Sequence, residues 1–562
     1  MKSEWCTFIR MKFFSRKILP IIVIMASLLG LSDTAWPLAS NNIPLDSPVY
    51  FYLEKLAAFG LVTTDFRGIR PFSKAEAARL VLEAEENLDK SRAVSDTGFV
   101  NTIISELRQT LAREISLYKK PVRAPWFDVN PLNNFKARYL YVDGIPRSYE
   151  RPVHDPGGDG VFGIGAGLRP DNPYPSPVQQ HGTEGTPLLE NIEGIRYERG
   201  SNYEFRFSSE AYAGRYATAL IEPLLISSEQ SGSTRLLMNK GYVKAGGGGL
   251  ELEAGRDANW LGLGYRGTVT LTSNARNFDI IKLSSPEPIS LKYIGDIKYA
   301  FIFSRFDNTV PNGQERQPYF VGAKLSVKPV ADLEFGVNLG RQVGGPGVDN
   351  GIGDMLRGVI GGTNADNSNS LAGLELRYRM PVLRNAEIYG EFSGEDTASF
   401  WPIVESYVAG FYIPRLTDLG KDDLRFEYFL GNNILYTNGT FPEGYLYRGM
   451  PIGHSQGGAT EDFFLRYSHW LSPRNRLALE YFHTERGNLG RVTISGSGQF
   501  DQNGVKQAVE RKNSWRAFWN LPVYGDVNME MMYGWERINN FNLVGGADQT
   551  NQIFKVDVSY RY

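Results

Sequence analysis

The last ten residues, "IFKVDVSYRY" (553–562), alternate strictly between apolar and polar side chains. In an extended segment this places Phe554, Val556, Val558 and Tyr560 on one face, because successive side chains of a strand point to opposite sides. Chain ends fray unless pairing holds them. The regular pattern therefore predicts a terminal strand that closes a sheet.

The same period of two continues from about residue 126 to the end, in segments separated by clusters of Gly, Pro, Asn and Asp. "LELRYRM" (374–380), "DLRFEYFL" (423–430) and "VNMEMMYGWE" (527–536) are examples. About nineteen such segments can be counted, one or two of them doubtful, so we expect about eighteen antiparallel strands. Their polar face carries both signs of charge, at Glu204, Arg206, Glu375, Arg377, Arg379, Glu387, Glu391, Arg425, Glu427, Arg466, Glu480, Glu530, Lys555, Asp557 and Arg561.

Before the strands, from Leu45 to about Lys120, apolar residues recur at helical spacing. Three segments predict helices: "SPVYFYLEKLAAFG" (47–60), "SKAEAARLVLEAEENL" (73–88) and "FVNTIISELRQTLAREISLYKK" (99–120). Ser73 and Glu76 have the spacing of a capping box at the start of the second helix. We expect a small helical bundle without chemistry of its own.

The N-terminal residues have the pattern of a secretory signal peptide. Lys12, Arg16 and Lys17 precede the apolar run "ILPIIVIMASLLGL" (18–31), which is short for a spanning helix of about 20 residues. An uncleaved anchor helix is the alternative, and translation starts at Met1 or at Met11. We expect residues 1–40 to be removed, by cleavage between Ala35 and Ser40. The only cysteine, Cys6, lies in this segment, so the mature chain is expected to have no thiol.

Composition excludes several classes of protein. Aromatic residues make up 13% and charged residues 22% of the 562 residues, and the mean hydropathy is -0.30. This balance is too aromatic for a disordered chain and too polar for a helical membrane protein. The net charge of -2 argues against nucleic acid as a partner.

Two architectures consist of alternating strands and turns: soluble sandwiches or propellers, and transmembrane barrels. A secreted propeller would show internal repeats of roughly 40 to 50 residues, which the sequence lacks. We therefore predict an all-β transmembrane barrel over residues 126–562, preceded by a periplasmic helical bundle over residues 41–125. Such a chain lies in the bacterial outer membrane in contact with lipid, and its C-terminal strand is expected to be recognised by the barrel-assembly machinery.

One apparent catalytic motif is "GHSQGG" (453–458), which matches the G-x-S-x-G nucleophile elbow with Ser455 as nucleophile. That chemistry needs a helix after the serine, whereas "ATEDFFLRYSHW" (459–470) alternates like a strand. A glycine-rich loop is the simpler interpretation, and a hydrolase stays the third alternative. The five histidines lack the spacing of metal ligands. We expect a protein that is not an enzyme and has neither metal nor cofactor.

The stretch 255–285, "GRDANWLGLGYRGTVTLTSNARNFDIIKLSS", is dense in planar donors and aromatic rings. Such side chains suit sugar hydroxyls and the CH faces of sugars, and equally suit the polar wall of a barrel. The residues alone favour the wall. The candidate polysaccharide-binding residues in this stretch are Arg256, Asp257, Trp260, Tyr265, Arg266, Asn274 and Arg276.

Several segments resemble the Wzi family of capsule-assembly outer-membrane proteins. They are "IPLDSPVYFYLEKLAAFGLV" (43–62), "RPFSKAEAARLVLEAEE" (70–86), "GRDANWLG" (255–262), "LTSNARNFDIIKL" (271–283), "YLYRGMPIGH" (445–454) and "EDFFLRYSHWLSPRNRLALEYFHTERG" (461–487). The resemblance covers about residues 43 to 562. It implies an outer-membrane barrel with a periplasmic helical bundle, acting as a lectin that holds capsular polysaccharide at the cell surface.

The alternative function is a carbohydrate-conducting porin, because the helical segment also resembles an S-layer homology unit. The interleaved charges of the polar face favour a lumen closed by ion pairs over an open channel. We therefore expect the glycan-binding surface on extracellular loops, around Trp260 and Tyr265 and between residues 445 and 454, where Tyr445, Tyr447, Arg448 and His454 are candidates.

Overall fold

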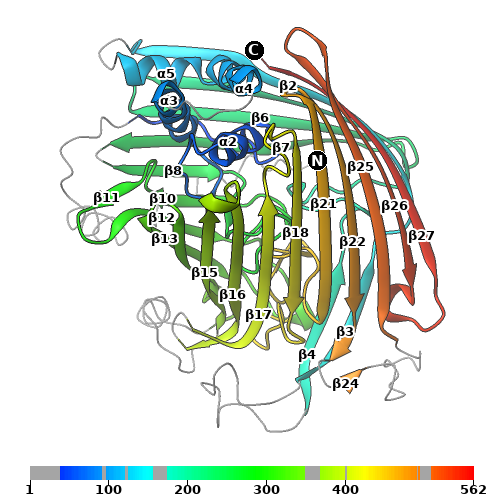
Figure 1. The fold of residues 1–562 in the computed structure, drawn as a ribbon. Coiled ribbons are helices and arrows are strands. Elements are labelled where there is room, and N and C mark those ends of the chain that lie inside the picture. Colours follow the sequence, from blue (N-terminus) through cyan, green and yellow to red (C-terminus); the bar gives the residue numbers. More distant parts are fainter. Residues whose placement is uncertain are drawn as a thin grey trace.

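The computed structural model describes residues 38–90, 97–120, 124–155, 174–247, 249–348, 368–398, 401–489, 492–493 and 508–561. These residues form a closed antiparallel barrel with a group of helices at one mouth (Figure 1). In barrel order, the eighteen strands are β2 (Phe127–Asp143), β5 (Gly200–Ala213), β6 (Ala217–Ser228), β7 (Thr234–Gly247), β8 (Leu250–Arg256), β10 (Asp279–Ser284), β12 (Gly295–Arg305), β13 (Tyr319–Val330), β14 (Leu333–Val343), β15 (Ser368–Met380), β16 (Ala386–Ala398), β17 (Trp401–Ile413), β18 (Asp422–Gly431), β21 (Thr460–Ser472), β22 (Asn475–Arg486), β25 (Glu510–Tyr524), β26 (Val527–Asn539) and β27 (Gln549–Arg561). The predicted fold class is confirmed.

Strand β27 closes the barrel, as the alternation at the C-terminus predicted. It pairs on one side with β26 and on the other with β2, where Tyr560 faces Phe135 and Asp557 faces Arg138. Strand β2 pairs in turn with β5. The last strand is therefore paired along both edges.

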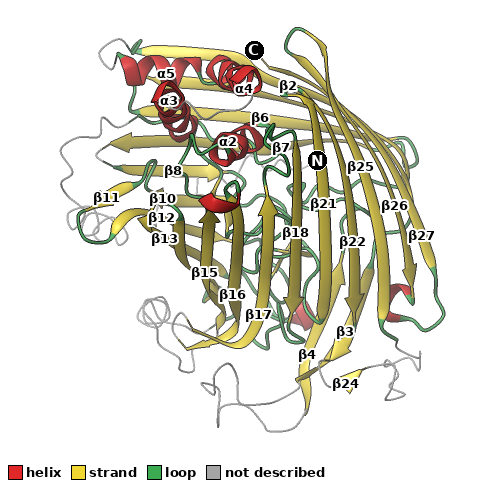
Figure 2. Cartoon of the chain, in the orientation of Figure 1, coloured by secondary structure: helices red, strands yellow, loops and turns green. Residues whose placement is uncertain are grey.

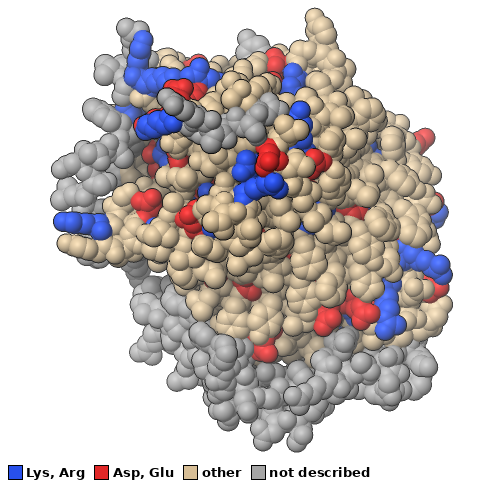
Figure 3. Space-filling model, viewed as in Figure 1, with Lys and Arg blue, Asp and Glu red and all other residues tan. Residues whose placement is uncertain are grey.

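The barrel wall is apolar outside and charged inside. On β22, Leu477 and Leu479 are exposed, whereas Glu480 and Thr484 on the opposite face are buried. The surface over β15 to β26 in Figure 3 is accordingly mostly neutral. This arrangement is typical of a barrel whose outer face contacts lipid.

Four helices are present in the described part of the chain: α2 (Val49–Ala58), α3 (Lys74–Lys90), α4 (Thr97–Thr110) and α5 (Ala112–Lys119). They pack around a shared apolar cluster that includes Leu56, Leu80, Ile103 and Leu107. Figure 2 shows them together at one end of the barrel, which we call the helical mouth. In the described residues, no helix is both long and apolar enough to cross a membrane.

The helix ends differ in two details from the sequence pattern. Ser73 caps α3, because its hydroxyl accepts a hydrogen bond from the Glu76 backbone N–H at 3.1 Å. The Glu76 carboxylate does not complete the capping box but pairs with Lys298 of strand β12. The third predicted helix is divided into α4 and α5 at Leu111, where the backbone leaves helical geometry (φ -115°, ψ 22°).

The connections at the two mouths differ in length. Those at the helical mouth are mostly short turns, such as 214–216, 331–332 and 473–474. Those at the other end, the loop mouth, include the long segments 144–199, 257–278 and 432–459. The remaining short elements are β1 (Ile69–Arg70), β3 (Ser148–Asp155), β4 (Tyr174–Thr183), β9 (Trp260–Leu261), β11 (Ile289–Leu291), β19 (Leu446–Tyr447), β20 (Met450–Pro451), β23 (Asn488–Leu489), β24 (Val492–Thr493) and the 3-10 turns η5 (Pro311–Gly313), η6 (Pro381–Leu383) and η7 (Phe541–Leu543).

Candidate functional site: the closed lumen and the rim of the loop mouth

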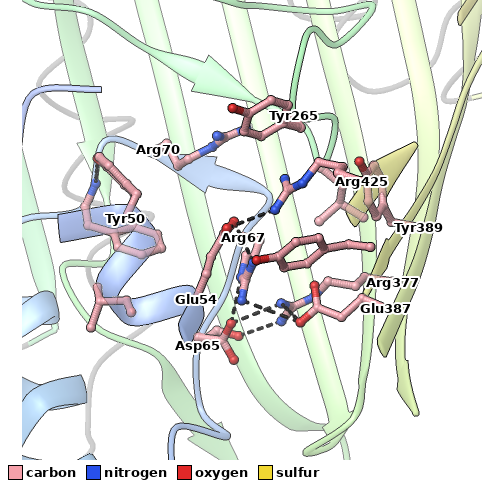
Figure 4. A pocket seen from close by; sticks show the side chains of 14 residues that line it. Tyr50, Glu54, Asp65, Arg67, Arg70, Tyr265, Arg377, Glu387, Tyr389 and Arg425 are labelled. Carbon is pink, nitrogen blue, oxygen red and sulfur yellow. Dashed lines mark hydrogen bonds and ion pairs between the residues drawn. The ribbon is translucent and has the colours of Figure 1, made fainter. Parts of the chain in front are cut away.

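Ion pairs join the helical unit to the inner wall of the barrel. Asp65, in the segment between α2 and α3, accepts hydrogen bonds from Arg377 (3.0 Å), Arg379 (2.8 Å) and Arg67 (2.9 Å). Glu54 of α2 bridges Arg67 at 2.8 Å and Arg425 of β18 at 2.9 Å (Figure 4). These buried charges neutralise one another, so the prediction that mixed charges in the lumen pair together is confirmed.

Asp65 shows how strongly this network favours the charged state. Burial by itself raises the pKa of a carboxyl group, but the guanidinium groups of Arg377 and Arg379 hold the pKa of Asp65 well below 3.8. The carboxylate is therefore ionised at any physiological pH. A buried ionic centre of this kind needs all of its partners in place.

A small cavity remains beside this network. It has a volume of about 40 Å³ and is lined by Glu54, Arg67, Tyr265, Tyr389 and Arg425, among others (Figure 4). Since a water molecule needs roughly 10 to 15 Å³ on this measure, the cavity has space for a few waters. It is too small for a sugar ring.

Two connections from the loop mouth, 257–278 and 432–459, fold into the lumen. Their buried backbone N–H groups find acceptors on the wall: Glu427 accepts from Tyr265 at 2.6 Å and from Arg266 at 2.9 Å, and Glu391 accepts from Val269 at 3.1 Å. Carboxylates of the inner wall thus satisfy loop backbone that would otherwise be unpaired. These segments also share an apolar core that includes Leu261, Val269, Tyr445 and Ile452.

The helical unit and the 257–278 segment meet inside the barrel. Strand β1 pairs with β9, so that Ile69 faces Leu261 and Arg70 faces Trp260. The Gly262 N–H donates to the Gly68 carbonyl at 2.8 Å, and the Arg70 guanidinium lies 4.4 Å from the centre of the Trp260 ring. The lumen is therefore filled by segments from both mouths. The segment from the helical unit and the 257–278 segment are hydrogen-bonded to each other.

Most of the predicted polysaccharide-binding residues lie inside this filling. Asp257, Trp260, Arg266, Asn274, Tyr445 and His454 are buried, and Tyr265 is mostly buried. The Tyr445 hydroxyl donates to the Thr270 carbonyl at 2.9 Å, the Asn274 amide donates to the Pro451 carbonyl at 3.1 Å, and Arg266 pairs with Glu190 at 2.9 Å. The expectation that Trp260, Tyr265 and most of 445–454 form an exposed loop surface is wrong, because inward folding provides these groups with protein partners.

The other four predicted residues come together at the rim of the loop mouth. Arg256 and Arg276 both donate to the Met238 carbonyl at 3.3 Å, and the Arg448 guanidinium lies 5.5 Å from the centre of the Tyr447 ring. Tyr447 itself is buried, whereas Arg448 is exposed. That any of the eleven predicted residues contacts glycan stays a prediction.

Two further arginines at this rim were not predicted. Arg235 donates to the Arg196 carbonyl at 3.0 Å, and Arg196 donates to the Arg448 carbonyl at 2.9 Å. Both side chains are exposed. They come from separate parts of the chain, and neither lies in a motif, so no local pattern in the sequence could have identified them.

The apparent nucleophile elbow has a structural role. Ser455 is buried, its hydroxyl is 3.3 Å from the Glu190 carboxylate, and the following segment is strand β21 instead of a helix. The His454 ring stacks on Phe429, with ring centres 3.6 Å apart. Among the described residues, no group of three or more His, Cys, Asp or Glu side chains is arranged to hold a metal ion.

One protein family matches more than half of the chain. The family described as "Capsule assembly protein Wzi" matches residues 169–553. The structure resembles Wzi of Escherichia coli, described as an outer-membrane, carbohydrate-binding β-barrel involved in group 1 capsule assembly, with a TM-score of 0.63 and 16% identity over 94% of this chain and 100% of that chain.

Two solved structures of Pseudomonas aeruginosa proteins have lower TM-scores. OpdQ has a TM-score of 0.43 and 12% identity over 78% of this chain and 97% of its own. OprD has a TM-score of 0.38 and 10% identity over 78% and 97%. No curated protein matches the sequence.

Proposed function

Because the chain belongs to the family of Wzi capsule assembly proteins, we propose that it binds extracellular polysaccharide and attaches it to the cell surface during capsule assembly. The protein lies in the bacterial outer membrane, as its closed barrel and its family indicate. The proposal assigns it a lectin-like, non-enzymatic role.

The filled lumen is the observation that supports this role over transport. A porin needs an open constriction through which its solute passes. Here β1 and β9 pair inside the barrel, and the described cavity beside them has a volume of only about 40 Å³. A barrel closed in this way offers a polysaccharide a surface to bind, not a channel to pass through.

The proposed orientation places the loop mouth outside the cell and the helical mouth in the periplasm. Barrels of the outer membrane have short periplasmic turns and longer extracellular loops, and the two mouths differ in this sense. The outer wall then contacts lipid, and the fully paired strand β27 is the segment that we expect the barrel-assembly machinery to recognise.

The test is a measurement of capsule retention. Cells that lack this protein should release polysaccharide into the medium that cells with the protein hold on their surface, while total polysaccharide stays the same. Unchanged retention after deletion contradicts the proposal. Purified protein in planar bilayers should show no steady conductance, and a large channel that sugars block would favour the porin instead.

A further inference from the structure

Five arginines form a connected group at the rim of the loop mouth: Arg196, Arg235, Arg256, Arg276 and Arg448. We call this group the rim arginines. The Arg235 side chain donates to the Arg196 carbonyl, and the Arg196 side chain donates to the Arg448 carbonyl. Arg256 and Arg276 both donate to the carbonyl of Met238, which lies three residues after Arg235. The five arginines thus come from strands β7 and β8 and from the three connections 144–199, 257–278 and 432–459.

Among the described residues, only two of the rim arginines form a salt bridge with a carboxylate. Arg256 pairs with Asp279 at 2.9 Å, and Arg448 pairs with Asp307 at 2.6 Å. Within the part of the chain that the structure describes, Arg196, Arg235 and Arg276 lie in no ion pair, and their hydrogen bonds go to backbone carbonyls and to the Asn239 side chain. Glu198 is a further carboxylate near Arg235, and Glu193 is the carboxylate near Arg276. Glu193 already pairs with Arg206 at 2.9 Å and with Lys240 at 2.7 Å.

Arg276 lies at the most crowded point of this group. Burial lowers the pKa of Arg276 to about 10, and the carboxylate of Glu193 opposes this shift, whereas the positive charges of Arg256 and Arg448 add to it. The guanidinium is therefore still charged at neutral pH, and among the described residues it forms no salt bridge, because the nearby Glu193 pairs with Arg206 and Lys240. An anion brought to this point would relieve the repulsion among the arginines.

We propose that the rim arginines bind carboxylate groups of an acidic extracellular polysaccharide, an inference that rests on the proposed function. The planar guanidinium fork matches a carboxylate in a bidentate arrangement. The backbone bonds hold the arginines before the ligand arrives, which reduces the entropy lost on binding. Several such contacts along one chain of sugars add by multivalency.

The position of the group favours polysaccharide over the phosphates of membrane lipid. Arg196, Arg276 and Arg448 belong to connections that cover the mouth of the barrel, and of the five only Arg256 lies on an outward-facing strand position beside exposed Met238. The shared surface therefore faces the aqueous side of the mouth.

The experiment uses the full-length protein in nanodiscs, with polyglucuronate oligosaccharides as the acidic probe and the same oligosaccharides with reduced carboxyl groups as the neutral probe. We expect the acidic probe to bind roughly tenfold or more tightly than the neutral one, and to weaken as salt is raised. Equal binding of the two probes overturns the inference.

The variant Arg196→Gln/Arg235→Gln/Arg276→Gln should lose roughly tenfold or more of the affinity for the acidic probe. The matched control, Lys90→Gln/Arg108→Gln/Lys119→Gln, removes three exposed charges at the helical mouth and should bind as the wild type does. Arg196→Lys keeps the charge but loses the fork, so an intermediate loss is expected even if the triple variant folds poorly. Wild-type affinity in both rim variants overturns the inference.

Two outcomes separate this inference from its premise. If the triple variant still retains capsule in cells, while deletion of the protein releases it, the proposed function stands and the rim arginines are not its binding site. If the triple variant loses binding to lipid A in nanodiscs but not to polyglucuronate, the arginines serve membrane lipid and the inference is wrong.

Discussion

The two mouths of the barrel are both covered by protein, but their charges are arranged in different ways. At the helical mouth, Asp65 accepts hydrogen bonds from three arginines, and Lys55 pairs with Asp423 at 2.9 Å. All of these side chains are buried or nearly so. At the loop mouth, Arg196 and Arg235 are exposed and bond only to carbonyl oxygens among the described residues.

The difference follows from the cost of burying charge. A buried ion without a partner is strongly unfavourable, so the charges that hold the helical unit in place occur in matched sets. An exposed guanidinium keeps its water and needs no partner in the protein. Paired charges at the helical mouth therefore provide closure, whereas the exposed Arg196 and Arg235 at the loop mouth, which form no ion pair among the described residues, belong to the group that we propose binds a ligand.

The sharpest test of this comparison is the side of the membrane on which each mouth lies. A cysteine at Ser231, in the exposed 229–233 turn of the loop mouth, should react with a membrane-impermeant maleimide on intact cells. A cysteine at the exposed Asp89 of α3 should react only after the outer membrane is disrupted. The native Cys6 lies in the predicted signal peptide and should not interfere. Labelling of Asp89→Cys in intact cells would reverse the orientation.

Removing a carboxylate should cost far more at the helical mouth than at the loop mouth. Asp65→Asn removes one of the two buried carboxylates that Arg67, Arg377 and Arg379 share, so that Glu387 alone faces all three, and should lower the free energy of unfolding by about 3 to 5 kcal/mol. Asp143→Asn breaks the half-exposed pair with Arg199 at the loop mouth and should cost about 1 kcal/mol or less. Urea unfolding measures both changes, and equal costs would contradict the comparison.

Acid should destabilise the protein because His454 is buried in one of the loops that fold inward from the loop mouth. Burial lowers the pKa of its imidazole from 6.5 to about 3. Between these values the unfolded chain binds a proton that the folded protein does not, so the free energy of unfolding falls as the pH falls below 6.5. The loss at pH 5 should be about 2 kcal/mol. The measurement is urea unfolding at pH 7 and at pH 5. The loss of stability at pH 5 should be seen in the wild type and be absent from His454→Gln. The same pH dependence in the wild type and in the variant would refute the role of His454.

The smallest effect is expected for Ser455→Ala. The hydroxyl donates one long hydrogen bond to Glu190 and accepts another from the Gln456 amide, so its removal should change the free energy of unfolding by about 1 kcal/mol or less. Capsule retention should be unchanged. Glu190→Gln is the contrasting variant, because Glu190 pairs with both Arg266 and Arg516 and its loss should destabilise the protein more. An esterase or retention defect specific to Ser455→Ala would support the hydrolase.

The barrel wall was predictable from local sequence. Lipid on one side and charge on the other impose a period of two on every strand, so alternation alone assigns Leu376 and Tyr378 to one face and Glu375 and Arg377 to the other, as the folded barrel has them. The same logic identified the closing strand β27, and residue spacing identified the cap at Ser73. These features depend on neighbours within a few residues.

The filling of the lumen and the grouping of the rim arginines were decided only by the tertiary structure, although the sequence had singled out Arg256, Arg276 and Arg448 as candidates. Nothing in the alternation of β8 and β18 says that the connections after them turn inward, and that turn buried Trp260 and Tyr445. Arg196, Arg235, Arg276 and Arg448 are separated by tens to hundreds of residues, and no shared period relates them. Local sequence determines which side of a strand faces lipid, because that environment is the same at every position along the wall. Which loops meet inside a closed barrel depends on contacts across its lumen, and those exist only once the barrel has formed.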